Sequence, residues 1–564
     1  MPRREIVTPA QRRWLHDSEI AADCMNRRPI LNTARIARIA MFASAVGMAF
    51  PVFSAATPSL SGPPGESLTC RDCHASEVEG YARSTMDHSL RIANNEPEGV
   101  VRTAEGSISA ESAPGGSWQV LHSGGTRSSF RVDYVIGSGH HASGYLIDID
   151  NHLFQSPIAY YRRRHSYGLA PGFESTPDPG FTRPVTPGCL FCHAGEAVPV
   201  SGTRNEYASP PFHAMAIGCS RCHGSAAEHL ADPGPGNIIN PARLAPAARD
   251  SICEQCHLIG VARVLNPGKS FSDFKPGQPL EETFTIYHNV PPPGTTGNFR
   301  VISQAEELAM SVCARRSKGK LWCGTCHDPH SLPDNPISYY RAKCLACHNA
   351  SFPVNHPSKT SNCIACHMPR RDTTDGGHTA FTDHRIQRRP EPEFSDPDEA
   401  DIAAWREPAP ALQKRNLGIA LIEVGMQRNS PKLIVRGYRI LTEVQTEFGG
   451  DSDLYTWMGN ALLLGNQFAE AQRAFTIALR LDPDSPMKEA DVGQAYAAGG
   501  AFDAARAHLE RALQLDPLDL TAAYALLQVY QKQGDVTSAA ALSSRLEQAM
   551  KHTVVNSKDS SGLR

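Results

Sequence analysis

Alternating apolar and polar positions mark an early part of the chain as β-structure. The stretches SSFRVDYVIG (128–137) and GYLIDIDNHLFQSPIAYY (144–161) follow the two-residue period with which side chains point to opposite faces of a strand. Within the second stretch, DIDNH supplies turn-forming residues between two apolar runs. We therefore predict a small antiparallel β insert at about residues 100–165.

A different pattern recurs near the C-terminus with a period of 34 residues. The segment YTWMGNALLLGNQFAEAQRAFTIALRLDP (455–483) returns as ADVGQAYAAGGAFDAARAHLERALQLDP (490–517). Small residues and prolines match in register: Gly459 and Gly493, Ala471 and Ala505, Ala478 and Ala512, Pro483 and Pro517. This period and pattern resemble the tetratricopeptide repeat, in which paired helices stack into a solenoid with a concave groove.

Further copies extend the repeat in both directions. A third copy from about residue 521 keeps Tyr530 and Ala539 but lacks the proline, and a degenerate helical pair occupies 411–448. We predict an all-α repeat domain at 411–550, a linker at 391–410 before it and a disordered tail at 551–564. The repeat is interpreted as a docking surface for a partner protein; a stability module is the alternative.

An apolar run near the N-terminus predicts export. The run IAMFASAVGMAFPVFSAA (39–56) follows a stretch that contains Arg27, Arg28, Arg35 and Arg38, and it ends in small residues. We predict a signal peptide at 1–56, with Met25 as the true start. An uncleaved anchor that associates the protein with a membrane is the alternative, because 18 residues lie at the short limit for a span. Both interpretations place the rest of the chain outside the cytoplasm, in the periplasm or its equivalent.

The overall composition says little about function, but the positions of the cysteines along the chain are informative. The formal net charge of −3 gives no reason to expect nucleic-acid binding. Of 16 cysteines, 14 fall in seven copies of Cys-x-x-Cys-His, at 70–74, 189–193, 219–223, 253–257, 323–327, 344–348 and 363–367. Cys24 precedes the apolar run, so Cys313 alone stands outside the motifs in an exported chain, and a disulfide framework is excluded.

Cys-x-x-Cys-His is the attachment pattern of c-type haem. Two cysteines three residues apart lie on one turn of a helix and bind the two vinyl groups, and the adjacent histidine is the proximal iron ligand. Zinc sites also use Cys-x-x-Cys pairs but do not require a histidine after every pair, as all seven have here. The predicted attachment residues are Cys70, Cys73, Cys189, Cys192, Cys219, Cys222, Cys253, Cys256, Cys323, Cys326, Cys344, Cys347, Cys363 and Cys366. The predicted proximal ligands are His74, His193, His223, His257, His327, His348 and His367.

Each iron has a second axial position, and the same region offers 13 further histidines for it: His88, His122, His140, His141, His152, His165, His213, His229, His288, His330, His356, His378 and His384. A second histidine gives a low-spin iron that transfers electrons without binding substrate. Met86 is a further candidate, because methionine ligation raises the potential of a haem.

The motifs fall within a seven-haem cytochrome domain that we predict at 57–390. We expect this domain to be mostly α-helix and loop, with the β insert packed over haems. The all-α repeat solenoid follows it. The chain from Cys70 to His384 provides about 45 residues per haem, which is too little for a conventional core. We therefore expect the porphyrins to serve as the core.

Residues 66–390 also resemble a known family. The phrases YVIGSGHHASGYLI, LFQSPIAYY, LAPGF, CHGSAAEHL, INPARL, CEQCHL, CGTCHDPH and CIACHMPRRDTTDGGHTAFTDHRIQRR are similar to those of multihaem c-type cytochromes related to the tetrahaem cytochromes of ammonia oxidisers (doubled CxxCH type), in the subgroup with a tetratricopeptide tail. The resemblance implies His141, His229, His330, His356, His378 and His384 as distal ligands. For the first haem it leaves Met86 and His88 open.

The resemblance also indicates roles for the remaining histidines and for Cys313. His122, His152 and His165 match no family position and are interpreted as structural or surface residues, with His140 and His213 intermediate. Cys313 is interpreted as a buried free thiol, with a redox role near a haem edge as the alternative.

Two functions follow from these motifs. The first is an exported electron carrier that docks redox partner proteins through its repeats. The second is an oxidoreductase that acts on nitrite, hydroxylamine or tetrathionate at one haem with an open axial site. No Cys-x-x-Cys-Lys motif is present, which counts against the nitrite reductases of the pentahaem type.

The low ratio of residues to haem predicts that residues 60–390 do not fold without the cofactor, as in metal-dependent domains. Replacing the motif cysteines with alanine should abolish cooperative unfolding of this region, as measured by thermal melting. A cooperative melt of the haem-free variant contradicts this expectation.

Overall fold

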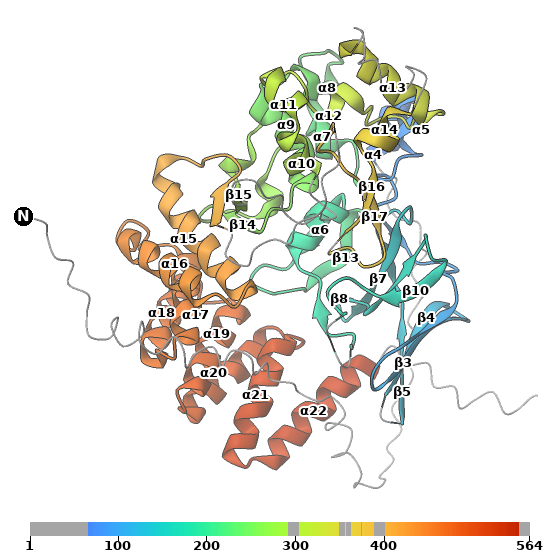
Figure 1. Cartoon of the computed structure of the whole chain (residues 1–564). Coiled ribbons are helices and arrows are strands. Elements are labelled where there is room, and N and C mark those ends of the chain that lie inside the picture. The colour runs from blue at the N-terminus through green and yellow to red at the C-terminus, as the bar shows by residue number, and fades with distance from the viewer. Residues whose placement is uncertain are drawn as a thin grey trace, which may run out of the picture.

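The computed structural model describes residues 66–123, 125–174, 176, 179–290, 304–348, 356, 362–373, 375–388 and 401–551. A region with β-sheets and short helices is followed by an all-α helical repeat that runs along one side of it (Figure 1). No helix in these ranges is long and apolar enough to cross a membrane. The predicted signal at 1–56 and the predicted tail, apart from Lys551, lie outside the described residues.

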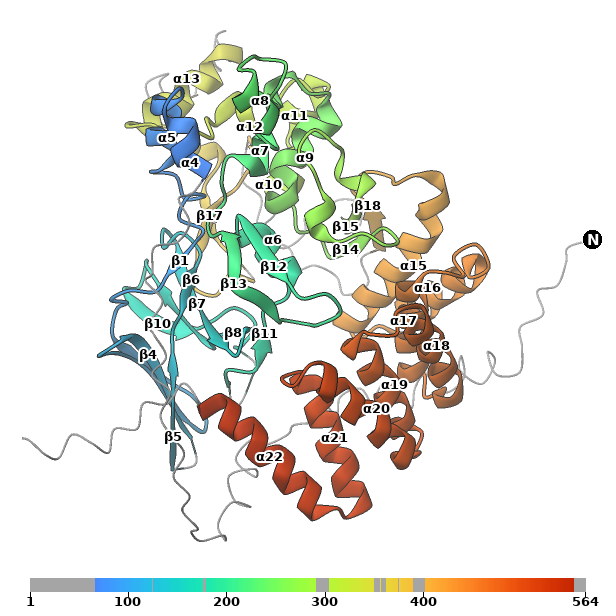
Figure 2. The same ribbon diagram turned by 180° about the vertical axis from the view of Figure 1, so that it is seen from behind.

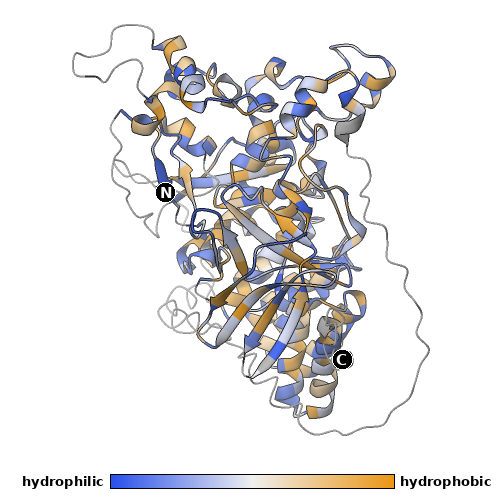
Figure 3. Ribbon diagram, turned by 90° about the vertical axis from the view of Figure 1, so that its right-hand side faces the viewer, coloured by the Kyte–Doolittle hydropathy of each residue, from blue (hydrophilic) through white to orange (hydrophobic). Residues whose placement is uncertain are grey.

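Two antiparallel sheets form the β part. The four-stranded sheet runs in the order β2 (Gly99–Arg102), β3 (Gly106–Ala113), β4 (Gly116–Ser123), β5 (Thr126–Arg131). The seven-stranded sheet consists of β1 (Leu90–Ile92), β6 (Tyr134–Ile136), β7 (Ala142–Ile149), β8 (His152–Gln155), β9 (Ile158–Tyr161), β10 (Ser166–Leu169) and β11 (Arg183–Pro184). Hydrophobic and hydrophilic residues alternate along these strands (Figure 3), so that each sheet buries one set of side chains.

The β structure is more extensive than the sequence predicted. The strands run from Leu90 to Pro184 rather than over about 100–165. The predicted turn lies between β7 and β8, where Asp150 and Asn151 have φ values of 49° and 66°. Two consecutive residues with positive φ are typical of a type I′ turn, which matches the twist of a hairpin.

A conventional apolar core lies in this β part, and in this respect the sequence-based expectation was wrong. Ile108, Phe130, Ile147, Phe154 and Phe181 form a buried cluster. By contrast, Ala380 is the only buried apolar residue among the described residues from 304 to 388. The average of about 45 residues per haem therefore combines segments of two kinds. The β part packs its own apolar side chains, whereas the segment at 304–388, which contains the last three motifs, does not.

The motifs lie on or at the ends of short helices: α4 (Glu66–Arg71), α6 (Pro187–His193), α7 (Ser220–His223), α9 (Pro246–His257), α12 (Cys323–Cys326), α13 (Pro336–Cys347) and α14 (Cys363–His367). The other short helices of this region are α5 (Ala75–Tyr81), α8 (Ala227–Ala231), α10 (Gln304–Met310) and α11 (Val312–Ser317). Three 3-10 turns accompany them, at Pro241–Arg243, Phe271–Asp273 and Leu280–Glu282. Two further hairpins are β12 (Glu196–Pro199) with β13 (Tyr207–Ala214), and β16 (Arg370–Asp372) with β17 (Ala380–Thr382).

A three-stranded sheet connects this region to the repeat. Its strands are β14 (Ala262–Leu265), β15 (Phe284–Val290) and β18 (Asp401–Ala404), with β15 in the centre. β18 lies within the stretch predicted as a linker at 391–410, so residues 401–404 are a strand rather than a linker. The first repeat helix therefore starts from a strand that is already paired.

Eight helices form the repeat: α15 (Pro410–Gln427), α16 (Pro431–Val444), α17 (Ser452–Leu464), α18 (Phe468–Leu481), α19 (Pro486–Ala498), α20 (Phe502–Leu515), α21 (Leu520–Gln533) and α22 (Val536–Lys551). The side chains of Asp451, Ser485 and Asp519, spaced 34 residues apart, accept hydrogen bonds from the first turns of α17, α19 and α21. A Cβ on Gly459 would lie 2.6 Å from Phe475, and one on Gly493 would lie 2.6 Å from Leu509. Glycine is thus required where paired helices approach closely.

Arg415 is the largest fully buried side chain, and it anchors the repeat to the three-stranded sheet. Its Nε donates to Asp451 Oδ2 at 2.8 Å, and its Nη1 donates to the carbonyl of Leu265. Arg415→Met leaves the buried Asp451 carboxylate unpaired, so we expect the free energy of unfolding of the repeat to fall by about 3–5 kcal/mol.

Chemical denaturation followed by far-UV circular dichroism measures this loss. Lys414→Met is the matched control, because Lys414 and its partner Glu443 are exposed and 2.9 Å apart at the surface. Equal midpoints for the two variants contradict the anchoring role of Arg415.

Candidate cofactor centres

Each Cys-x-x-Cys-His motif, here called a station and numbered in chain order, lies on a single turn of helix. The backbone amide of the histidine donates to the carbonyl of the first cysteine, at 2.9 Å in four stations: His74 to Cys70, His223 to Cys219, His327 to Cys323 and His348 to Cys344. This bond places both thiols and the imidazole on neighbouring faces of the turn. Except for α6, the helices with motifs gather in the upper part of Figure 1.

Four stations bring their histidine opposite a histidine from outside the motifs. The ring centroids lie 6.2 Å apart for His74 and His229, and 5.8 Å apart for His223 and His330. The corresponding distances are 6.2 Å for His327 with His384, and 6.0 Å for His367 with His356. The interplanar angles are 33° or less, so the two rings of each pair, here called a facing pair, have nearly parallel planes.

Hydrogen bonds fix the orientation of several of these rings. Nδ1 of His223 lies 2.7 Å from the carbonyl oxygen of Ile239, and Nδ1 of His367 lies 2.8 Å from that of Gln387. Among the facing histidines, Nδ1 of His384 lies 2.8 Å from the carbonyl oxygen of Thr382, whereas Nδ1 of His229 contacts both the carbonyl and the amide of Gly234. A carbonyl only accepts, so Nδ1 of His223, His367 and His384 carries the proton and Nε2 keeps a lone pair for a metal.

Burial favours the neutral form of five imidazoles at the stations. Desolvation lowers the pKa of His193, His223, His257 and His384, and it lowers the pKa of His327 to about 4. A neutral imidazole is the form that binds a metal.

The facing pairs fit a haem iron between them. Two imidazole nitrogens, each about 2.0 Å from one metal ion on opposite sides, place the ring centroids roughly 6 Å apart. Zinc does not fit the pairs in the same way, because a tetrahedral site takes its ligands from four converging directions. The motif cysteines and the facing histidines are therefore the residues that would hold the haems.

The thiols of the stations lie close to one another. Those of Cys192 and Cys256 are hydrogen-bonded, and so are those of Cys253 and Cys323 and those of Cys344 and Cys363. The hydrogen bond with Cys256, together with Arg263 and Arg221, lowers the pKa of Cys192 to about 6. A low thiol pKa favours the thiolate, which is the reactive form of cysteine.

Further contacts join the remaining stations into one series. Cys326 lies near Cys347, and Cys222 lies near Cys253. His74 and His330 both lie near His223, and a Cβ on Gly80 of α5 would lie 2.4 Å from the carbonyl oxygen of His330. Station 1 therefore lies next to station 3, and station 3 lies next to station 4. Station 4 also lies next to stations 2 and 5, and stations 6 and 7 follow station 5.

Three stations lack a facing histidine in the part of the chain that the structure describes. Within the described residues, no ring contact joins His193, His257 or His348 to another histidine. His257 is instead hydrogen-bonded to the side chain of Gln304.

The other predicted ligands lie elsewhere. His141 packs on Phe381 with centroids 4.2 Å apart and accepts a hydrogen bond from Arg370 at 3.4 Å, and His378 packs on Tyr161 at 5.0 Å. Nδ1 of His88 lies 2.9 Å from the carbonyl of Ser84, which leaves its Nε2 free, and Met86 precedes it. Their roles as ligands stay predictions.

Several residues at these centres gave no signal in the sequence. Tyr340 places its hydroxyl 3.1 Å from Nδ1 of His327, and Gln304 contacts His257. Cys313, by contrast, was singled out in the sequence; it is half-buried and lies near Cys326 and Cys344, between stations 5 and 6. Backbone carbonyls that orient the rings carry no sequence information, so spacing alone does not find them.

Comparisons with known proteins add little to this geometry. Neither a protein-family model nor a curated protein matches the chain. A structure titled MamA MSR-1 C2 is 18% identical over 26% of this chain and 80% of its own, with a TM-score of 0.23. A structure of MamA 41-end from Desulfovibrio magneticus RS-1 is 16% identical over 25% and 80%, also with a TM-score of 0.23. Likenesses this weak carry no argument about function.

The facing pairs yield a direct prediction. His330→Ala removes the ring opposite His223, so one iron should change from low-spin to high-spin in the oxidised protein, as seen by electron paramagnetic resonance. His165→Ala, at an exposed turn between β9 and β10, is the control and should leave the spectrum unchanged. An unchanged spectrum for His330→Ala contradicts the pairing.

Proposed function

We propose that this protein is an exported multihaem c-type cytochrome that carries out one-electron transfer through seven covalently bound haems. The observation that carries the proposal is the four facing imidazole pairs, each of which joins a motif histidine to one outside the motifs at 5.8–6.2 Å. When bound, haem supplies an iron that accepts and returns one electron. The chain's own residues tether the group, orient its ligands and exclude water.

Contact between stations supports the proposed relay. Hydrogen-bonded thiols at Cys192 and Cys256, and at Cys253 and Cys323, place station 4 between stations 2 and 5. Station 3 meets station 4 from another direction, through Cys222 and Cys253, and station 1 adjoins station 3 through His74 and His223. The proposed path is therefore branched, with station 4 at its junction.

The helical repeat, which we interpret as of the tetratricopeptide type, is the proposed docking region for a redox partner protein. Part of it is already covered by this chain, because the loop between β12 and β13 reaches α19 and α21 (Figure 2). In this loop, the carbonyl of Gly202 accepts from Ser485 at 3.5 Å, and Arg204 lies near Asp491 and Asp519. A partner must therefore use the surfaces of the repeat that this loop leaves uncovered.

A second function is favoured by the three stations without a facing histidine. An iron held only by His193, His257 or His348 leaves an axial position for a small ligand. The alternative is thus an oxidoreductase acting on nitrite, hydroxylamine or tetrathionate at one of these stations.

The spin state of the oxidised wild-type protein distinguishes the two functions. A relay through irons with two axial ligands predicts no high-spin signal, and no change when nitrite, hydroxylamine or tetrathionate is added. A high-spin signal that shifts on addition of one of these compounds would establish the oxidoreductase instead. The His330→Ala variant serves as the positive control for detecting one high-spin iron among seven.

A further inference from the structure

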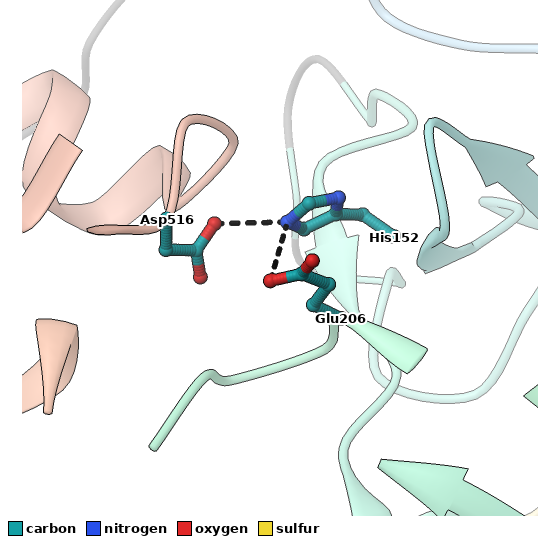
Figure 4. A group of neighbouring side chains, drawn as sticks. All are labelled: His152, Glu206 and Asp516. Atoms are coloured by element: carbon teal, nitrogen blue, oxygen red, sulfur yellow. Dashed lines mark hydrogen bonds and ion pairs between the residues drawn. The ribbon is translucent and has the colours of Figure 1, made fainter. Parts of the chain in front are cut away.

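A buried histidine and two carboxylates meet where the β part contacts the helical repeat (Figure 4). His152 begins β8, Glu206 directly precedes β13, and Asp516 directly follows α20. The Nε2 atom of His152 lies 2.8 Å from Oδ1 of Asp516 and 4.0 Å from Oε2 of Glu206. One ligand atom from each residue lies within 4.8 Å of the other two.

The backbone holds these side chains in place. His152 and Glu206 form an antiparallel bridge, and the amide of Tyr207 donates to the carbonyl of Asn151 at 2.9 Å. The amide of Leu518 donates to Oδ1 of Asp516 at 3.2 Å. The site is therefore built from rigid segments that lie far apart in the sequence.

The orientation of the imidazole is that of a metal ligand. Nδ1 of His152 lies 2.9 Å from the carbonyl oxygen of Asp150, which only accepts, so Nδ1 carries a proton. In the neutral ring, Nε2 then directs a lone pair toward the two carboxylates. Histidine ligands of metals are commonly oriented in this way by a carbonyl at the other ring nitrogen.

Both the charges and the hydrogen bonding around His152, Glu206 and Asp516 favour a bound cation. The side chain of Asp516 is fully buried, and within the described part of the chain its Oδ2 has no hydrogen-bond partner. If His152 were protonated, one positive charge would face two carboxylates and leave a net negative charge in a buried place. Asp519 lies close to Asp516 and adds a further negative charge, which Arg204 offsets. A divalent ion with a neutral imidazole balances both carboxylates and occupies the free oxygen.

We propose that His152, Glu206 and Asp516 bind a divalent transition-metal ion of the zinc class, which joins the β part to the helical repeat. One nitrogen and two oxygens suit Zn²⁺, whereas Mg²⁺ and Ca²⁺ prefer sites made of oxygen alone. This site is separate from the stations and does not depend on the proposed electron transfer.

Zinc binding to the full-length, haem-loaded protein tests the proposal. After dialysis against a chelator, the protein is equilibrated with Zn²⁺, and the zinc per chain is measured by elemental analysis together with the melting temperature. The wild type should bind one tight Zn²⁺ and melt at a higher temperature with zinc present. Glu206→Gln should weaken this binding about tenfold or more and remove the thermal shift.

Two further variants complete the test. Asp516→Asn should lose the same ion, and Glu206→Gln alone decides the question if Asp516→Asn does not fold, because Glu206 is partly exposed. His508→Ala is the control for adventitious binding, since Nδ1 of His508 pairs with Glu489 at 2.7 Å on the repeat without a third ligand. Absence of tight zinc in the wild type, or equal zinc binding in the wild type and Glu206→Gln, overturns the proposal and leaves a protonated His152 in an ion pair.

Discussion

The gap between facing imidazole rings is the constraint on which the region with the motifs depends. The ring centroids of His223 and His330, for example, lie 5.8 Å apart. Because a carbonyl fixes Nδ1 of His223, the lone pair at its Nε2 is available to a metal ion. In our proposal an iron lies between the rings of all four pairs and binds a nitrogen of each.

The same constraint explains how little apolar packing this region has. The β part buries residues such as Phe154 and Phe181, and the repeat buries residues such as Phe475 and Leu509. Among the described residues from 304 to 388, Ala380 is the only buried apolar residue. A macrocycle offers apolar surface that short helices such as α12 and α14 do not supply.

Local patterns predicted what local physics determines. The turn at Asp150–Asn151, the paired repeat helices and the one-turn geometry of each Cys-x-x-Cys-His follow from period, turn chemistry and spacing. Contacts between distant segments were not predictable in this way. β18 is four residues long and exists because β15 pairs with it, and His152 was interpreted as structural or surface although Asp516, 364 residues away, meets its ring. Thirteen histidines near seven motifs allow many pairings, and only their positions in space select four of them.

Covalent haem at every station is the central claim, and the intact mass of the purified exported protein tests it most directly. The mass should equal that of the polypeptide plus seven haems, and it should persist under denaturing conditions because thioether bonds survive unfolding. A mass equal to that of the polypeptide alone, or zinc at the stations in place of haem, contradicts the claim and everything inferred here about electron transfer.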